Sequence, residues 1–191
     1  HIAIIGAGIG GTALAVAFLH RGIPFTLYER DKDFDSRAQG YGLTLQQASK
    51  AIAGLGVASL DQGIISTRHV VHNPEGEIIG EWGMRRWNVT PKENNKRKNI
   101  HIARQSLRAE LMNQLKNSQN VQWGHKFINF SQNENDFSIE FEVDNKTIVH
   151  KADLIVGADG IHSNVRKQLI RNSDTAAVSY THLTLPTKRI V

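Results

Sequence analysis

The stretch HIAIIGAGIGG, from His1 to Gly11, decides the fold. Its unbroken apolar run, Ile2–Ile5, is typical of a central parallel strand that is covered on both faces. The glycines that follow, Gly6, Gly8 and Gly11, have the spacing G-x-G-x-x-G. In a strand–turn–helix unit these glycines permit the tight turn, let the backbone approach a pyrophosphate, and let helix and strand pack closely. The stretch therefore predicts a phosphate-binding βαβ unit.

The residues after Gly11 complete this unit. Residues 12–21 are rich in Ala and Leu at helical spacing, and Gly22 is a good C-terminal stop. The second strand, Phe25–Tyr28, ends at Glu29, eighteen residues after Gly11. An acidic side chain at this point can accept hydrogen bonds from both hydroxyls of an adenosine ribose. The alternative is an ordinary βαβ turn without a ligand, but strand, helix and acid together favour a dinucleotide.

A second segment of the same kind lies near the other end of the chain. The sequence ADLIVGADGIHSNVRKQL, from Ala152 to Leu169, again reads as an apolar strand, a glycine turn and a helix. Two such units in one short chain predict a dinucleotide that is held at two points. We expect Ile2–Ile5, Phe25–Tyr28 and Leu154–Val156 to be neighbouring parallel strands. Both glycine loops should then lie at one sheet edge, where open α/β sheets bind ligands.

The middle of the chain predicts a mixture of short helices and antiparallel strands. A hairpin is expected over Arg68–Trp82, with its turn at Pro74–Gly76. Helices are expected over Gln46–Leu55 and Gln105–Asn117, the second with leucines at i, i+4 spacing on one face. The segments VQWGHKFINF, FSIEFEV and TIVHKA, separated by Asn- and Asp-rich turns, predict an antiparallel meander.

Composition limits the functional classes. Of 191 residues, 40% are apolar and 21% are charged, which is typical of a globular domain. The net charge of +5 suits an anionic cofactor, and the basic cluster at residues 96–98 has no interleaved aromatic residue to suggest nucleic acid. Cysteine is absent, which excludes disulfides and thiolate metal sites, and the histidines lack metal-ligand spacing. No run could span a membrane. A reducing, cytoplasmic location is expected.

The C-terminal residues have an unusual composition. The helical pattern Ser163–Ile170 gives way to RNSDTAAVSYTHLTLPTKRIV. We interpret residues 173–191 as a non-native tail, in the way that cloning scars are excluded from fold reasoning. The alternative is a genuine β-segment, since VSYTHLTL alternates apolar and polar residues.

The order of these elements, with their motifs, resembles the FAD-binding part of the flavoprotein aromatic hydroxylases, the para-hydroxybenzoate and salicylate hydroxylase type. The resemblance spans residues 1 to about 170 and implies a Rossmann-like, three-layer α/β fold with a parallel sheet and an antiparallel β-meander. It implies an FAD-binding domain over residues 1–172, with the hairpin at residues 67–83 as a candidate part of a substrate-domain layer. The quoted segments are GAGIGG, LYER, SRAQGYGLTLQ, HIARQSLRAEL and GADGIHSNVRKQL, the last with the pattern D-G-x-x-S-x-V-R.

At the N-terminal end, the resemblance implies that the loop from Gly6 through Gly8 to Gly11 binds the FAD pyrophosphate. Glu29 would hold the adenosine ribose, and Arg30 would lie against the adenine. These two residues end the second strand in LYER.

Further along the chain, the resemblance implies three more FAD contacts. Arg37 would lie near the phosphates and the ribityl chain, and Arg104 would contact the FAD from the start of the long helix. Asp159 would hydrogen-bond the FAD ribose and order the loop used in binding NAD(P)H. Ser163 is expected to cap the next helix, and Arg166 to brace the motif. An ordinary loop arginine at Arg37 and a plain turn residue at Asp159 are the alternatives.

The function implied by the resemblance is that of an NAD(P)H-dependent flavoprotein monooxygenase, which hydroxylates an aromatic or similar small organic substrate. Because the chemistry belongs to FAD, we assign no catalytic acid or base. The family's third motif, which contains Gly-Asp, and most of its substrate sheet are absent, so we expect this fragment to be inactive alone. One alternative is a nicotinamide-dependent dehydrogenase with NAD in the first βαβ unit. Another is a truncation with no function of its own.

Overall fold

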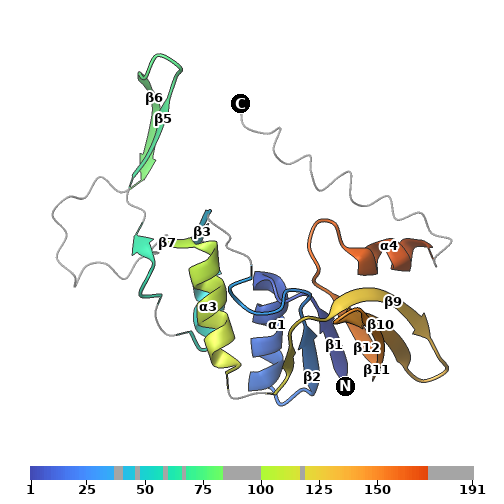
Figure 1. Cartoon of the computed structure of the whole chain (residues 1–191). Helices are drawn as coiled ribbons and strands as arrows, with labels where there is room; N and C mark the ends of the chain where they lie inside the picture. Colours follow the sequence, from blue (N-terminus) through green and yellow to red (C-terminus); the bar gives the residue numbers. More distant parts are fainter. Residues whose placement is uncertain are drawn as a thin grey trace.

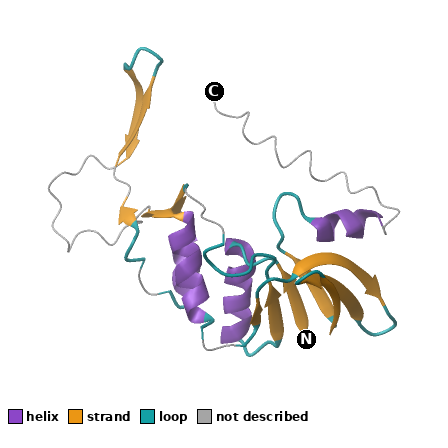
Figure 2. Ribbon diagram, in the orientation of Figure 1, coloured by secondary structure: helices purple, strands orange, loops and turns teal. Residues whose placement is uncertain are grey.

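The computed structural model describes residues 1–36, 41–45, 48–57, 60–65, 68–83, 100–116 and 119–171. The predicted tail at residues 173–191 lies outside these ranges, as does Arg37. Figures 1 and 2 show a central sheet with helices on one side, a curved antiparallel sheet on the other, and a hairpin that stands apart.

The central sheet is parallel and has the strand order β12-β1-β2-β8. Strand β1 (Ile2–Ile5) pairs on one side with β2 (Phe25–Tyr28) and on the other with β12 (Leu154–Gly157). The predicted parallel neighbours are therefore confirmed. Strand β8 (Val121–Gln122) extends the sheet beyond β2.

The faces of this sheet are covered by different layers. On one face, Ile4 and Leu27 pack against Ala15 and Val16 of α1 (Ile9–His20) and against Leu115, just after α3 (Arg104–Gln114). Helix α1 begins three residues before the predicted start, at the residue after Gly8. Burial of apolar side chains on both sheet faces explains why the β1 sequence is continuously apolar rather than alternating.

The other face is covered by the meander, which consists of β9 (Lys126–Gln132), β10 (Phe137–Val143) and β11 (Lys146–Ala152). Ile139 and Phe141 are fully buried there in one cluster with Ala3, Ile5 and Tyr28. Helix α4 (Asn164–Arg171) follows β12 and contacts β9. The three-layer α/β architecture predicted from the sequence is thus confirmed.

The segment VQWGHKFINF differs from its prediction as one meander strand. Its first residues, Val121–Gln122, pair in parallel with Leu27 and Tyr28, and only the part from Lys126 joins the meander. Gly124, with φ of +72°, lies between the two parts. A left-handed conformation suits glycine and interrupts a strand, so the segment serves two sheets.

A smaller antiparallel sheet has the order β3-β7-β4 and lies beside α3. It consists of β3 (Gly42–Leu45), β7 (Ile100–Ala103) and β4 (Ile64–Ile65). Its buried side chains pack with α2 (Ala48–Gly54) and α3. The predicted hairpin is present as β5 (Arg68–His72) and β6 (Ile78–Gly83). Within the described ranges, no helix has the length and apolar character needed to cross a membrane.

Candidate functional site

The two glycine loops meet at one edge of the parallel sheet. The Ala158 amide donates a hydrogen bond to the Ile5 carbonyl at 2.8 Å, which continues the pairing of β1 with β12 beyond their ends. Gly6 has φ of +105°, and a β-carbon there would lie 2.6 Å from the Ala158 carbonyl oxygen. Only glycine therefore lets the first loop approach the second so closely. The predicted placement of both loops at one edge is confirmed.

The N-terminus of α1 has the properties of an anion site. Gly8 is its N-cap, no side chain in the described part of the structure caps the helix, and its first turn contains no acidic residue. Among the described residues, a β-carbon on Gly8 would meet nothing within 4 Å, so no described residue fills the space above Gly8. Uncapped amides and the positive end of a helix dipole favour a phosphate. Gly11 differs, because a β-carbon there would overlap the Gly6 carbonyl oxygen, so this glycine serves loop packing.

Glu29 is buried under the first loop, where 8% of its surface is exposed. One carboxylate oxygen accepts the Ala7 amide at 2.7 Å, and the other accepts the Asp31 amide at 3.1 Å. Each carboxylate oxygen can accept a second hydrogen bond. Both oxygens of Glu29 can therefore still accept a hydrogen bond from a ribose hydroxyl. Arg30 is exposed, with its Nε 4.0 Å from Asp31. Its contact with adenine stays a prediction.

Asp159 caps α4 with one carboxylate oxygen. This Oδ2 accepts the Asn164 amide at 2.7 Å and the Val165 amide at 3.3 Å. Its other oxygen, Oδ1, is buried and has no hydrogen-bond partner within the described ranges. A buried acceptor without a partner is costly, so Oδ1 suits a ligand hydroxyl.

Ser163 and Arg166 hold the same turn in the way that the sequence predicts. The Ser163 Oγ accepts the Arg166 amide at 2.9 Å, which confirms this serine as a helix cap. The guanidinium of Arg166 donates to the Ile161 carbonyl at 2.5 Å. These bonds fix the part of the loop that leads from Asp159 into α4.

The start of α3 carries a second buried acceptor without a partner. Arg104 begins the helix, with its amide bonded to the Tyr41 carbonyl and its guanidinium 5.4 Å from the Tyr41 ring centre. The next residue, Gln105, donates from its side chain to the Phe34 carbonyl at 3.1 Å, while its Oε1 is buried and unpaired among the described residues. Gln105 was not predicted as a site residue.

Arg108 is a buried residue beside the first glycine loop that the sequence analysis did not single out. Only 3% of its surface is exposed, and its Nε donates to the Ala7 carbonyl at 2.7 Å. Its guanidinium lies 4.9 Å from the Phe34 ring centre and 5.6 Å from that of Trp123. The signal was present in the sequence, because Arg108 is three residues before Leu111 and shares its apolar helix face.

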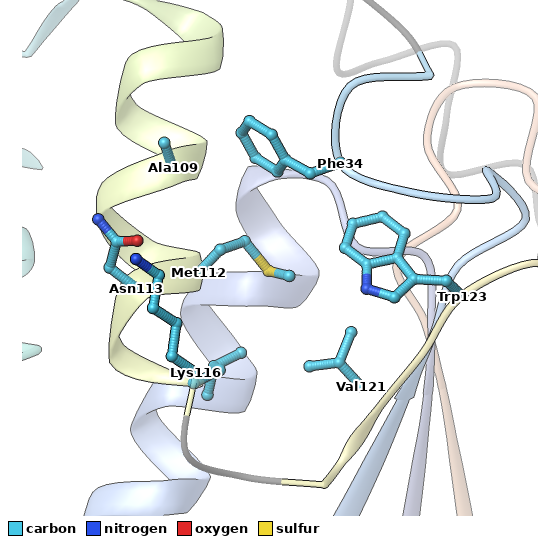
Figure 3. Close-up of a pocket in the computed structure, with 8 residues that line it drawn as sticks. Phe34, Ala109, Met112, Asn113, Lys116, Val121 and Trp123 are labelled. Carbon is cyan, nitrogen blue, oxygen red and sulfur yellow. The ribbon is translucent and has the colours of Figure 1, made fainter.

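A pocket of about 470 Å³ opens beside this arginine, between α3 and the segments that carry Phe34 and Trp123 (Figure 3). Its walls are mainly apolar, with Met112 directed toward the Trp123 ring. No residue of either glycine loop lines the pocket. It therefore lies next to the dinucleotide edge and is not the groove between the loops. The lining residues are Phe34, Ala109, Met112, Asn113, Leu115, Lys116, Val121 and Trp123.

Comparison with known proteins shows the family to which this chain belongs. A family described as "FAD binding domain" matches residues 1–185. The chain belongs to this family. A protein of Arthroderma benhamiae named "Probable FAD-dependent monooxygenase" is 33% identical to this FAD-binding domain over 88% of the chain and 38% of the relative. The FAD-dependent monooxygenase thnD of Trichoderma harzianum is 30% identical over 91% of the chain and 41% of the relative.

Solved structures agree on the fold. The 2,6-dihydroxypyridine-3-hydroxylase of Arthrobacter nicotinovorans matches this FAD-binding domain with a TM-score of 0.71 and 22% identity, over 89% of the chain and 39% of the hydroxylase. The chain spans about two-fifths of the length of the curated relatives that it matches. Since the chain belongs to an FAD-binding family, the match supports FAD rather than NAD as its cofactor. The open space at Gly8 and the unpaired Asp159 Oδ1 fit this cofactor.

Proposed function

We propose that the chain holds FAD within an NAD(P)H-dependent monooxygenase that hydroxylates an aromatic or similar small organic substrate. Two relatives are named FAD-dependent monooxygenases, which supports the oxygen-transfer reaction. The observation that carries the proposal is the contact between the two glycine loops, because it gives one extended cofactor two anchor points. A cofactor held in this way lies across the carboxyl ends of β1, β2 and β12.

Each anchor suits a different part of FAD. The amides at the start of α1, above Gly8, would bind the pyrophosphate. Glu29 would bind the hydroxyls of the adenosine ribose, and Asp159 would accept from a hydroxyl on the flavin side. Arg104 would contact the cofactor between them, from the start of α3.

The residues of this chain bind and orient the cofactor, and the cofactor supplies the chemistry. When bound, FAD can accept a hydride and activate oxygen. A net charge of +5 favours association with an anion of this kind. Glu29 also has a structural role. Its carboxylate accepts a hydrogen bond from the Ala7 amide and so stabilises the loop without a ligand.

The proposal is tested in two steps. First, FAD is titrated into the chain and binding is followed by flavin fluorescence quenching, with NADP⁺ as the competing dinucleotide. Second, the protein that contains this chain at the length of its relatives is assayed for NADH and NADPH oxidation with phenols and heteroaromatic compounds. We expect saturable FAD binding and a hydroxylated product by mass spectrometry. Preference for NADP⁺ over FAD would contradict FAD as the cofactor. Oxidation of NADH or NADPH without a hydroxylated product would contradict hydroxylation as the reaction.

A further inference from the structure

The Ala7 peptide, between the first two glycines of the loop, is held from both sides. Its amide donates to the buried Glu29 carboxylate at 2.7 Å. Its carbonyl accepts from Arg108 at 2.7 Å and from the Thr12 hydroxyl at 3.2 Å. Ala7, Thr12 and Arg108 are all buried. A peptide with three such bonds cannot rotate without losing buried hydrogen bonds.

The Arg108 contact is unusual because it buries a cation without a counter-ion. The guanidinium forms no ion pair with a carboxylate in the described part of the chain. Its partners are neutral: the Ala7 carbonyl, the Phe34 carbonyl at 3.5 Å, and the rings of Phe34 and Trp123. A buried charge with only neutral partners is costly. That cost falls when an anion binds on the other side of the loop.

We propose that Arg108 is a positioning residue for the FAD pyrophosphate. By fixing the Ala7 carbonyl, it sets the direction of the peptides that follow, so that the first amides of α1 face the open space at Gly8. Its positive charge, placed behind the loop, also stabilises the two phosphate charges in front of it. The inference rests on the FAD-binding role of the chain, and it adds a residue that does not touch the cofactor.

The aromatic contacts explain why this residue is arginine. A planar guanidinium can lie against the Phe34 and Trp123 rings and still donate to a carbonyl. A lysine at this position would keep the charge but lose the fixed fork of donors. The charge and the geometry of Arg108 can therefore be separated by substitution.

The test compares Arg108→Met, Arg108→Lys and the control Leu111→Val, which alters the buried face of α3 one turn away. Affinities for FAD, ADP and adenosine are measured by calorimetry or competition, and stability is measured by urea unfolding. We expect Arg108→Met to lower the affinities for FAD and ADP by at least about tenfold. The affinity for adenosine, which has no phosphate, should fall by less than about twofold. Arg108→Lys should recover part of the FAD and ADP affinity. Leu111→Val should change stability but not the ratio of ADP to adenosine affinity.

The inference would be overturned if the Arg108 variants lost affinity for ADP and adenosine equally, or if they kept wild-type affinity for FAD. Either result would leave the proposed FAD-binding function unaffected. If Arg108→Met does not fold, Arg108→Lys decides, since selective weakening of ADP over adenosine supports the inference and an unchanged ratio overturns it. Failure of the wild-type chain to bind either FAD or ADP is a different result, because it would overturn the proposed function together with this inference.

Discussion

Gly6 and Asp159, far apart in the sequence, are packed so closely that there is no room for a side chain on Gly6. A β-carbon on Gly6 would come within 2.9 Å of the Asp159 Cα atom. The contact follows from the pairing of β1 with β12, whose last residues, Ile5 and Gly157, are in register. The two glycine loops are therefore packed against each other, and the proposed FAD site is formed by both.

Gly8→Val should abolish tight FAD binding and leave the fold intact. The backbone conformation of Gly8, with φ of −68°, is available to any residue, and no atom of the residues that the structure describes is found within 4 Å of the added β-carbon. The new side chain would occupy the space meant for the pyrophosphate. We expect FAD affinity to fall by more than about tenfold, with unfolding free energy within about 0.5 kcal/mol of wild type. Gly54→Ala in α2, also in open space, is the control, and wild-type FAD affinity in Gly8→Val would refute the assignment.

Gly11→Ala should have the opposite profile. Here the β-carbon would overlap the Gly6 carbonyl oxygen, which belongs to the loop backbone and cannot move aside as a flexible side chain could. Overpacking of this kind costs about 1–3 kcal/mol. Urea unfolding should show that loss in the absence of any ligand. An unchanged midpoint would mean that α1 and the loop are not packed as described.

Asp159→Ala and Ser163→Ala form a matched pair. Both residues cap α4, through the amides of Asn164, Val165 and Arg166, so each substitution should cost about 1 kcal/mol of stability. Only Asp159 has a buried oxygen without a partner. FAD titration should therefore show a loss of about tenfold in affinity for Asp159→Ala and little change for Ser163→Ala. Similar losses in both variants would mean that Asp159 acts only as a cap.

The contact between the parallel sheet and the meander should weaken in acid because of His150. Burial, and to a smaller extent the charge of His125, lowers the pKa of His150. Its Nε2 is buried without a partner in the described ranges, and its ring lies 5.3 Å from that of Tyr28. Protonation is therefore easier in the unfolded chain. The stability that depends on neutral His150 should be fully present above the pKa of about 6.5 that histidine has in the unfolded chain. It should be lost as the pH falls toward the lower pKa of His150 in the folded protein.

His150→Phe retains an aromatic ring beside Phe141 and removes the titrating group. Urea unfolding at pH 7.5 and 5.5 should show a smaller loss of stability in acid for this variant than for wild type. His72→Gln, on the exposed hairpin, should leave the loss unchanged. If wild type and His150→Phe lost the same stability between pH 7.5 and 5.5, the loss would come from groups other than His150.

The parallel core could be predicted from the sequence because its signals are local. Strands β1 and β2 have their predicted limits, and the glycine spacing identified the edge at which the loops meet. Val121–Gln122 was assigned to the wrong sheet because a two-residue strand has no periodicity to read. Its parallel partner, Leu27–Tyr28, lies far away in the sequence.

The rest of the site depends on contacts between distant segments. Strand β3 was missed because its partner β7 lies more than fifty residues further along the chain, and no local pattern links them. No role was predicted for Arg108, because its bond to the Ala7 carbonyl joins residues that are 101 positions apart in the sequence. Arg37 was predicted as a phosphate contact and remains a prediction outside the described residues.

The most direct test of the account is hydrogen–deuterium exchange of the chain with and without FAD. One cofactor held at two anchor points should slow exchange in both loop regions, residues 6–13 and 157–166, over the same range of FAD concentrations. Exposed segments such as the β5–β6 hairpin should not change. Protection confined to residues 6–13 would show that the first βαβ unit binds its ligand alone, and would contradict the two-loop FAD site.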